Sequence, residues 1–219
     1  MSNDSVQRVK VESKSNNGIK FGICTMVLML FCCFLLVICT FIQLNITHFI
    51  IPEGLFSGEK IGIVDFLYTY KFIPQVPIVL FIGALLGRKY GIACVVLYIL
   101  AGLFFIPIFA LGGGLKYIGE YGFGYILAYI PAVFFAGSIL RSGFSNRNML
   151  HAAIVGVLTI HLVGILYMFM ISLIRNETWA FMQSWIVAQS GMKIIYDLIF
   201  SFFALFAAKY ARLLIWAYI

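Results

Sequence analysis

Charged residues are scarce in this chain. Only 11% of its 219 residues are charged and 63% are apolar, whereas about 25% of the residues in an ordinary soluble domain are charged. So little charge cannot cover the water-facing surface of a soluble domain. A bilayer core needs about 20 consecutive apolar residues for each helix, and the sequence contains several such stretches separated by polar breaks. We therefore expect an all-α integral membrane protein.

The sequence also lacks the motifs of several functional classes. It contains no P-loop, so the chain cannot hydrolyse ATP by itself. An intramembrane aspartyl protease needs two membrane-embedded aspartates, and here only Asp197 falls within an apolar stretch. Ser138 and His161 are present, but nothing around them predicts a strained nucleophile turn or an oxyanion hole. The five cysteines lie in apolar stretches without CxxC spacing, which gives no case for a disulfide or a metal site. We expect no enzymatic activity, no metal and no cofactor.

Six transmembrane helices account for the apolar stretches. The first apolar run, from Phe21 to Ile42, is longer than the roughly 7 to 15 residues of a signal-peptide core, so we expect it to remain as a helix. Residues 1–18 are rich in Ser, Asn and Lys and are expected to form a disordered cytoplasmic tail. The substrate-binding domain then covers residues 19–219, with helices at about 20–44, 72–87, 90–110, 122–140, 150–174 and 190–216.

The distribution of lysine and arginine predicts the orientation. With the N-terminus inside, ten of the fifteen basic residues fall on the inner side: Arg8, Lys10, Lys14, Lys20, Arg88, Lys89, Arg141, Arg147, Lys209 and Arg212. Basic residues are enriched in cytoplasmic loops, so both termini are expected to be cytoplasmic. The net charge of +7 does not indicate nucleic-acid binding, because the basic residues are spread singly along hydrophobic segments.

Several features are expected on the outer side. The loop at 46–70 is amphipathic and should lie on the membrane surface or cap the bundle. A glycine cluster at 112–114 is followed by further glycines and by tyrosines, including Tyr125. Glycine lets the backbone approach a ligand closely and tyrosine supplies a flat apolar face, but a simple turn would explain the same pattern. The small-residue stripe of the fourth helix (Gly124, Ala128, Ala132, Ala136) allows close packing of another helix, either within the bundle, which we favour, or from a partner. The isolated histidines His48, His151 and His161 are interpreted as interfacial or packing residues.

The last predicted helix contains two charged residues of opposite sign. Lys193 and Asp197 are four residues apart, so they lie on one helix face and can form an ion pair. Charges within a membrane span cost about 2.5 to 3.5 kcal/mol on insertion scales, so each requires a reason. The two interpretations left open are a pair that only neutralises itself and a polar pocket for a ligand.

Residues 75–140 resemble the BioY family, the substrate-binding (S) subunits of energy-coupling-factor (ECF) biotin transporters. Four segments occur in the family's order and spacing: Ala84–Gly91 (ALLGRKYG), Leu97–Phe109 (LYILAGLFFIPIF), the glycines at 112–114, and Gly122–Ala128 (GFGYILA). With less force, Gln75 corresponds to the glutamine of the family's Thr-Leu-Gln, and Asp197-Leu-Ile resembles the start of its Asp-Leu-Ile-Lys.

The resemblance implies a six-helix bundle that binds biotin at its outer face. It also implies that Asp197 accepts hydrogen bonds from the ureido group, that Tyr98 or Tyr125 covers the ring system, and that Gln75, Gly113 and Gly114 complete the site. The implied partners are a transmembrane coupling protein and two ATPase subunits, which alone would use ATP, and the implied location is a bacterial cytoplasmic (inner) membrane.

One departure from the family pattern concerns the ligand. Phe200 occupies the position of the family's lysine, a natural partner for the biotin carboxylate. Two explanations follow: Lys193, one turn before Asp197, supplies the charge from a neighbouring position, or the chain binds biotin differently or binds another vitamin or a biotin precursor. A structural membrane protein without transport activity is a further alternative. The first predicted helix also presents Gly18 and Gly22 followed by larger residues, which is a poor match to the small-residue face that the family uses to meet its coupling protein.

Overall fold

The computed structural model describes residues 22–52 and 62–218, with side chains up to residue 215. The predicted tail at 1–18 lies outside the described residues. In chain order the elements are α1 (Ile23–Phe41), β1 (Leu44–Phe49), η2 (Ile63–Phe66), β2 (Leu67–Phe72), α2 (Gln75–Phe104), η3 (Leu115–Gly119), α3 (Phe123–Leu127), α4 (Tyr129–Ile139), η4 (Leu140–Ser142), α5 (Asn146–Ile174) and α6 (Trp179–Tyr218).

Five helical stretches among the described residues are long and apolar enough to cross a bilayer: α1, α2, the continuous stretch 123–142, α5 and α6. The α2 stretch is a pair of antiparallel helices that turns at Gly87, where φ is +73°. A Cβ added at Gly91 would lie 3.3 Å from the Cα of Gly83, and the Gln75 amide lies 3.4 Å from the Tyr98 hydroxyl. A straight helix would hold that last pair about 34 Å apart at 1.5 Å per residue. With the two limbs of α2 counted separately, the described chain runs between the two ends of the bundle in six helical segments, although only five helices are long and apolar enough to span by themselves.

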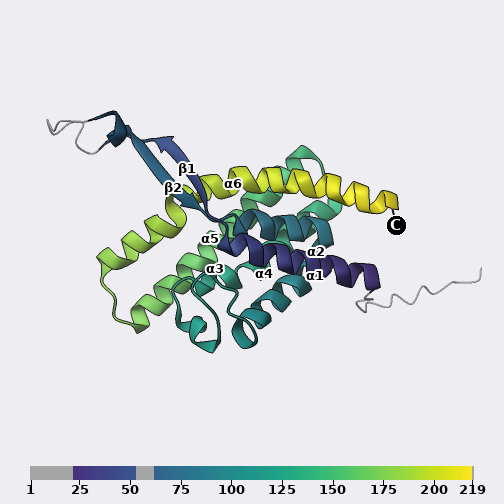
Figure 1. Ribbon diagram of the computed structural model, residues 1–219, viewed down its shortest axis with the longest axis horizontal. Helices are drawn as coiled ribbons and strands as arrows, with labels where there is room; N and C mark the ends of the chain where they lie inside the picture. Colours follow the sequence, from purple (N-terminus) through teal and green to yellow (C-terminus); the bar gives the residue numbers. More distant parts are fainter. Residues whose placement is uncertain (1–21, 53–61, 219) are drawn as a thin grey trace, which may run out of the picture.

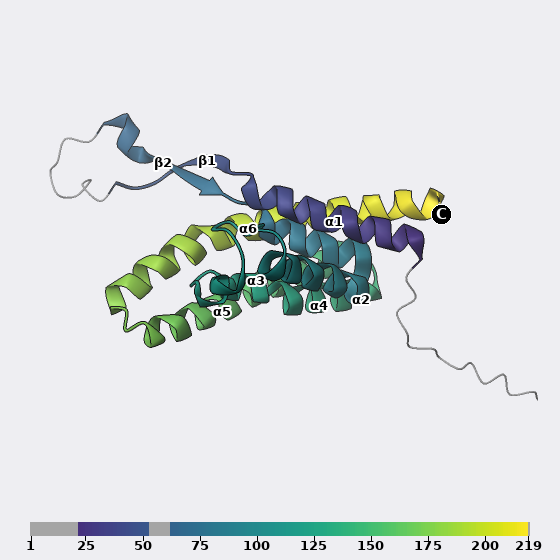
Figure 2. The same ribbon diagram turned by 60° about the horizontal axis from the view of Figure 1, so that its bottom comes forward.

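The two ends of the bundle differ in what they carry. Figures 1 and 2 both show the strands β1 and β2 at one end, and the start of α1 together with the C-terminal end of α6 at the other. We name the first the outer end and the second the inner end. The Gly87 turn and η4 also lie at the inner end, because both approach Arg212 of α6. The basic residues expected inside from the sequence and described here, Arg88, Lys89, Arg141, Arg147, Lys209 and Arg212, all belong to this end.

The α2 pair forms the centre of the bundle. It packs against α1, α4 and α6, while α5 packs against α3, α4 and α6. The small-residue stripe interpreted as packing is buried in this core, where Ala128, Ala132 and Ala136 are fully covered. A Cβ on Gly124 would clash with Tyr167 of α5 at 2.2 Å. The stripe therefore serves close packing within the bundle.

The predicted outer loop contains an element that the sequence analysis did not predict. β1 and β2 pair antiparallel, from Leu44 opposite Phe72 to Phe49 opposite Leu67, and project from the outer end (Figure 1). Thr47 and Thr69 face one another across the ladder, with their hydroxyl oxygens 3.0 Å apart. β-Branched and aromatic residues favour strands, and both segments are rich in them. These residues are therefore strands rather than the loop that was expected to lie on the membrane surface or cap the bundle.

Some helix boundaries also differ from those expected. The last helix begins at Trp179 rather than near 190, and it bends at Gly191, where ψ is −108°. The second helix begins at Gln75 because residues 67–72 form β2, and the third ends at Phe104. The predicted fourth helix consists of two short helices in tandem, α3 and α4, followed by η4. These changes place an extra three turns of α6 at the outer end, above the part that lies in the bundle.

Candidate binding site at the outer end

A cavity of about 380 Å³ opens at the outer end between α2, the loop before α3, α4 and α6. Its size suits a small organic ligand, since such sites measure roughly 300 to 1,000 Å³. Most of its lining is apolar or aromatic, with a few polar side chains. The lining residues are Gln43, Ile73, Gln75, Val76, Ala110, Leu111, Tyr117, Glu120, Tyr121, Gly122, Tyr125, Ile126, Tyr129, Trp185, Gln189 and Lys193.

The α6 wall of this cavity is one face of the helix. Trp185, Gln189 and Lys193 follow at intervals of four residues, so they lie on successive turns of the same side. The bend at Gly191 falls between the second and the third of them. An aromatic, an amide and an ammonium group are thereby stacked from the outer rim inward.

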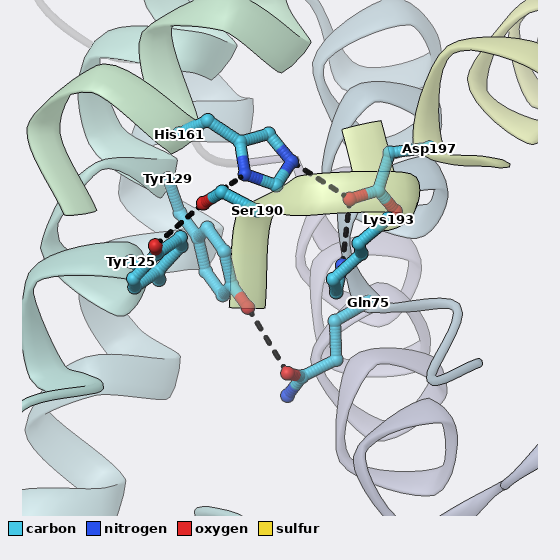
Figure 3. A network of polar contacts seen from close by, with 7 residues as sticks. All are labelled: Gln75, Tyr125, Tyr129, His161, Ser190, Lys193 and Asp197. Carbon is cyan, nitrogen blue, oxygen red and sulfur yellow. Dashed lines mark hydrogen bonds and ion pairs between the residues drawn. The ribbon is translucent and has the colours of Figure 1, made fainter. Parts of the chain in front are cut away.

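Behind Lys193 lies a fully buried carboxylate. The Lys193 ammonium nitrogen lies 2.6 Å from Asp197 Oδ2, so the ion pair expected from the sequence is present. The same oxygen lies 3.0 Å from His161 Nε2, and His161 Nδ1 lies 2.9 Å from the Ser190 hydroxyl. Figure 3 shows this chain of contacts running from Asp197 through His161 and Ser190 to Tyr125, whose hydroxyl is 2.7 Å from that of Ser190.

The other oxygen of this carboxylate is unusual. Asp197 Oδ1 is buried and has no hydrogen-bond partner among the described residues. A buried polar atom without a partner costs about 1 to 3 kcal/mol, more when it is charged, and calls for an explanation. A ligand with an N–H donor would satisfy it.

A second polar group is centred on Gln75, at the start of α2. Its amide nitrogen donates to Thr40 at 2.7 Å. Its amide oxygen accepts from the Tyr129 hydroxyl at 3.1 Å, as Figure 3 shows. Tyr98 lies deeper, with its hydroxyl 3.2 Å from that of Thr40. These contacts join α1, both limbs of α2 and α4 beneath the cavity and hold the Gln75 side chain in place.

Aromatic side chains form the outer rim. Tyr125 and Trp185 line the cavity and pack against one another with ring centroids 6.1 Å apart, and the Tyr121 ring centroid lies 6.0 Å from that of Trp185. Tyr121 donates to Glu177 at 2.6 Å and is covered by the Arg175 guanidinium at 4.7 Å. Burial raises the pKa of Tyr117, another lining residue, so its hydroxyl stays neutral at physiological pH. The rim can cover the flat apolar faces of a ligand.

The glycine cluster positions the loop instead of lining the cavity. Gly114 has φ of +85° and its N–H donates to Gly102 O at 2.9 Å. A Cβ on Gly113 would lie 2.6 Å from that same oxygen. Only glycine fits where the loop returns so closely to α2. The loop then delivers Leu111 and Tyr117 to the cavity wall.

Three of the seven residues predicted for the site, Gln75, Tyr125 and Lys193, line the cavity. Asp197 lies directly behind Lys193. The expectation that Tyr98 covers the ligand is not matched by its position, because it is buried beneath Gln75 and packs edge-on against Phe109. Gly113 and Gly114 act through the loop, as described above.

The sequence predicted His161 to be an isolated interfacial or packing residue, and the prediction that it is isolated was wrong. It is buried in α5 and bridges Ser190 and Asp197. A signal was available, because an ionisable residue in the middle of a predicted span is a functional candidate by default. Thr40, Tyr129, Trp185, Gln189 and Ser190 had no comparable signal in the sequence.

Phe200, at the position of the family's lysine, points to the hairpin. Its ring stacks on Phe72 of β2 with centroids 4.9 Å apart, and the Lys193 ammonium lies 5.5 Å from the Phe72 ring centroid. Lys193 therefore approaches the site from one turn further out than Asp197 and about two turns further out than Phe200. Among residues 22–52 and 62–218, no group of three or more His, Cys, Asp or Glu side chains is arranged to hold a metal ion.

Comparison with known proteins identifies the family. The BioY family model matches residues 12–215. A curated relative from Lysinibacillus sphaericus, described as a probable biotin transporter BioY, is 30% identical over 115 residues, which are 52% of this chain and 57% of the relative. The match thus spans just over half of that relative. The fold is also similar to that of a crystallised S-component for biotin from an ECF-type ABC transporter, with a TM-score of 0.62 and 20% identity over 87% of this chain and 91% of that chain. This chain is a member of the BioY family.

Proposed function

We propose that this membrane protein binds biotin in the outer-end cavity and serves as the substrate-binding subunit of an ECF-type transporter. The observation that carries the proposal is the paired arrangement of Lys193 and buried Asp197 at an aromatic-lined cavity of about 380 Å³. Biotin has a ureido group with two N–H donors, an apolar ring system and a carboxylate. The cavity offers a complementary group for each.

The ureido end requires an acceptor. Asp197 Oδ1 is buried without a partner among the described residues, and a carboxylate is a strong acceptor for N–H groups. Because Lys193 lies between Asp197 and the cavity, the ammonium must move outward when the ureido group arrives. Lys193 lies one helical turn, about 6 Å, further out than Asp197. Its swing toward Gln189 places it beside the carboxylate of the bound ligand.

The ring system requires apolar cover, and the adjacent rings of Tyr125 and Trp185 supply it from the cavity lining. Gln75 lies at the cavity floor, where Thr40 and Tyr129 hold its amide. In this arrangement the chain binds and orients its ligand, and no bond is made or broken.

Movement of the ligand across a bacterial cytoplasmic membrane would require partners, namely a transmembrane coupling protein and two ATPase subunits. The stripe on α4 is unsuited to a contact with the coupling protein, because Ala128, Ala132 and Ala136 are buried inside the bundle. The lipid-facing side of α1 remains, and its exposed residues include Leu30, Phe31 and Phe34. We infer that any coupling contact uses these large apolar side chains.

The test is binding of radiolabelled biotin to the detergent-purified protein, with Lys193→Met and Asp197→Asn beside the wild type. Lys116→Met is the matched control, since Lys116 is an exposed lysine of the outer loop region that does not line the cavity. Binding that is lost in the first two variants and kept in the third supports the proposal. A folded wild type that binds no biotin refutes it.

A second candidate, another vitamin or a biotin precursor as the ligand, is favoured by Phe200. Its stack on Phe72 fills the position of the family's lysine with apolar surface. A ligand without a carboxylate would find an apolar wall there. Competition of labelled biotin by a panel of vitamins and by dethiobiotin distinguishes the two candidates, because the true ligand displaces the label at the lowest concentration.

A further inference from the structure

A second cavity, of about 370 Å³, lies at the opposite end of the bundle. It is enclosed by the Gly87 turn of α2, the end of α4 and the last turns of α6. Four cationic side chains line it: Arg88 and Lys89 from the turn, Arg141 from η4 and Arg212 from α6. Residues remote in sequence thus converge on one hollow, far from the outer-end site.

This inner-end cavity contains no acidic counterpart. The Asp and Glu residues of the described chain are Asp65, Glu120, Glu177 and Asp197, and each belongs to the hairpin, the outer loops or the site described above. Both ion pairs among the described residues involve Asp197. Basic residues are expected at the cytoplasmic side of any membrane protein. That tendency does not explain why four of them should surround one hollow.

Aromatic and backbone contacts orient two of the guanidinium groups. Arg88 lies over the Phe134 ring at 5.2 Å, and Arg212 lies over Phe144 at 5.7 Å while it donates to Ala84 O at 3.4 Å. Both arginines are half-buried. A guanidinium held by its face keeps its planar N–H edge for an acceptor, and this edge matches two oxygens of a phosphate group.

A neighbouring hollow of about 440 Å³ shares Leu140, Arg141 and Arg212 with this cavity. Its remaining lining consists of Gly143, Phe144, Lys209 and Leu213, of which Phe144 and Leu213 are apolar and Leu213 is 59% exposed on the outside of α6. Apolar surface therefore adjoins the cationic cavity where α6 faces the bilayer. A free inorganic anion would gain no binding energy from that apolar surface. A phospholipid would place its headgroup in the cationic cavity and its acyl chains along the apolar part of the neighbouring hollow.

We propose that the inner-end cavity binds the phosphate headgroup of an anionic phospholipid, with Arg88, Arg141 and Arg212 as its ligands. Basic pockets between transmembrane helices on the cytoplasmic side suit such headgroups. The proposal is independent of which ligand the outer-end cavity binds.

The test titrates the purified protein in mixed micelles with phosphatidylglycerol, with phosphatidylcholine or with inorganic phosphate. Bound lipid is counted by native mass spectrometry, and stabilisation is measured by thermal unfolding. We expect retention and stabilisation with phosphatidylglycerol alone. Equal effects of phosphatidylcholine would overturn the proposal, and equal effects of inorganic phosphate would replace the lipid by a soluble anion.

Single substitutions locate the site. Arg212→Gln should weaken phosphatidylglycerol binding at least tenfold, while Arg147→Gln, which removes the same charge from an exposed position of α5 at the same end, should change it less than twofold. Arg141→Gln is the second variant, because Arg141 is exposed and its loss should leave folding intact. Equal losses in all three variants would show diffuse surface attraction and refute a built site.

Discussion

The losses of stability caused by substituting Lys193 and Asp197 should not be additive, because the two side chains form one ion pair. In Lys193→Met the fully buried carboxylate keeps only His161 as a partner, with one oxygen already lacking any among the described residues. Breaking a buried ion pair from one side costs about 3 to 5 kcal/mol. We expect a loss in this range, seen as a fall of at least about 6 °C in melting temperature at roughly 2 °C per kcal/mol.

Asp197→Asn should cost less, about 1 to 3 kcal/mol, because the Lys193 ammonium lines the cavity and can turn toward water. The double variant contains no uncompensated charge, and its asparagine still accepts from His161. Its loss should therefore fall short of the sum of the two single losses by about 1 to 3 kcal/mol, the usual coupling for residues in contact.

The assay is thermal or denaturant unfolding of the three variants in one detergent, with biotin binding measured on the same samples. The double variant should lose less stability than the two single losses added together, and it should not recover ligand binding. Single losses that add to the double within about 0.5 kcal/mol would refute the coupling inferred from the 2.6 Å contact. Recovery of binding together with stability would assign the pair a structural role alone.

Three further changes test the walls of the site and the neighbouring hairpin. Gly164→Ala places a methyl group 2.6 Å from the Tyr125 ring, and equilibrium binding should show biotin affinity at least tenfold lower. Gly156→Ala is the control, because its methyl group meets Leu80 at 2.5 Å. It should lower stability and leave biotin affinity within threefold of wild type. His161→Gln should lower affinity about tenfold or more by releasing Asp197 and Ser190, and an unchanged affinity would contradict the role of that network. Burial, followed by the charge of Asp197, raises the pKa of Tyr70 to about 12, so the stabilisation from its neutral phenol is complete below about pH 10 and is lost as the pH rises toward 12. The melting temperature of wild type should therefore fall relative to that of Tyr70→Phe over this interval, and parallel curves would contradict burial of Tyr70.

The spans could be predicted because the bilayer constrains them so strongly. Apolar runs long enough to cross, separated by Gly87-Arg88-Lys89 and similar breaks, leave little freedom in the number of crossings. The orientation of Lys193 toward Asp197 was also predictable, since four-residue spacing places both on one helix face.

The hairpin was not predicted because only the amphipathic character of the whole segment 46–70 was considered. Residues 67–72, Leu-Tyr-Thr-Tyr-Lys-Phe, alternate in the way that a half-buried strand requires, and that local period of two was the available signal. The first turns of α6 were missed for another reason. Gln183, Ser184 and Gln189 make this segment too polar for a span, although it is helical where it rises above the bundle.

Contacts between distant residues could not be predicted from one sequence. His161 lies 29 residues from Ser190 and 36 from Asp197, and only the packing of α5 against α6 brings the three together. The same holds for Gln75, whose partners come from α1, α4 and the far limb of α2. Residue type and helix period identify one face of a site, whereas the opposite walls depend on tertiary packing.

The charge balance of the outer-end site follows from these walls. Without ligand, Lys193 and Asp197 neutralise one another, and each would be left with an uncompensated charge if they merely separated. Under the proposed function, a ligand with N–H donors would satisfy the fully buried Asp197, which cannot reach water, and the displaced Lys193 ammonium would turn into the cavity. A ligand that also carries a carboxylate would compensate the ammonium there. The proposed site would therefore favour ligands with a donor end and an anionic end, and biotin has both.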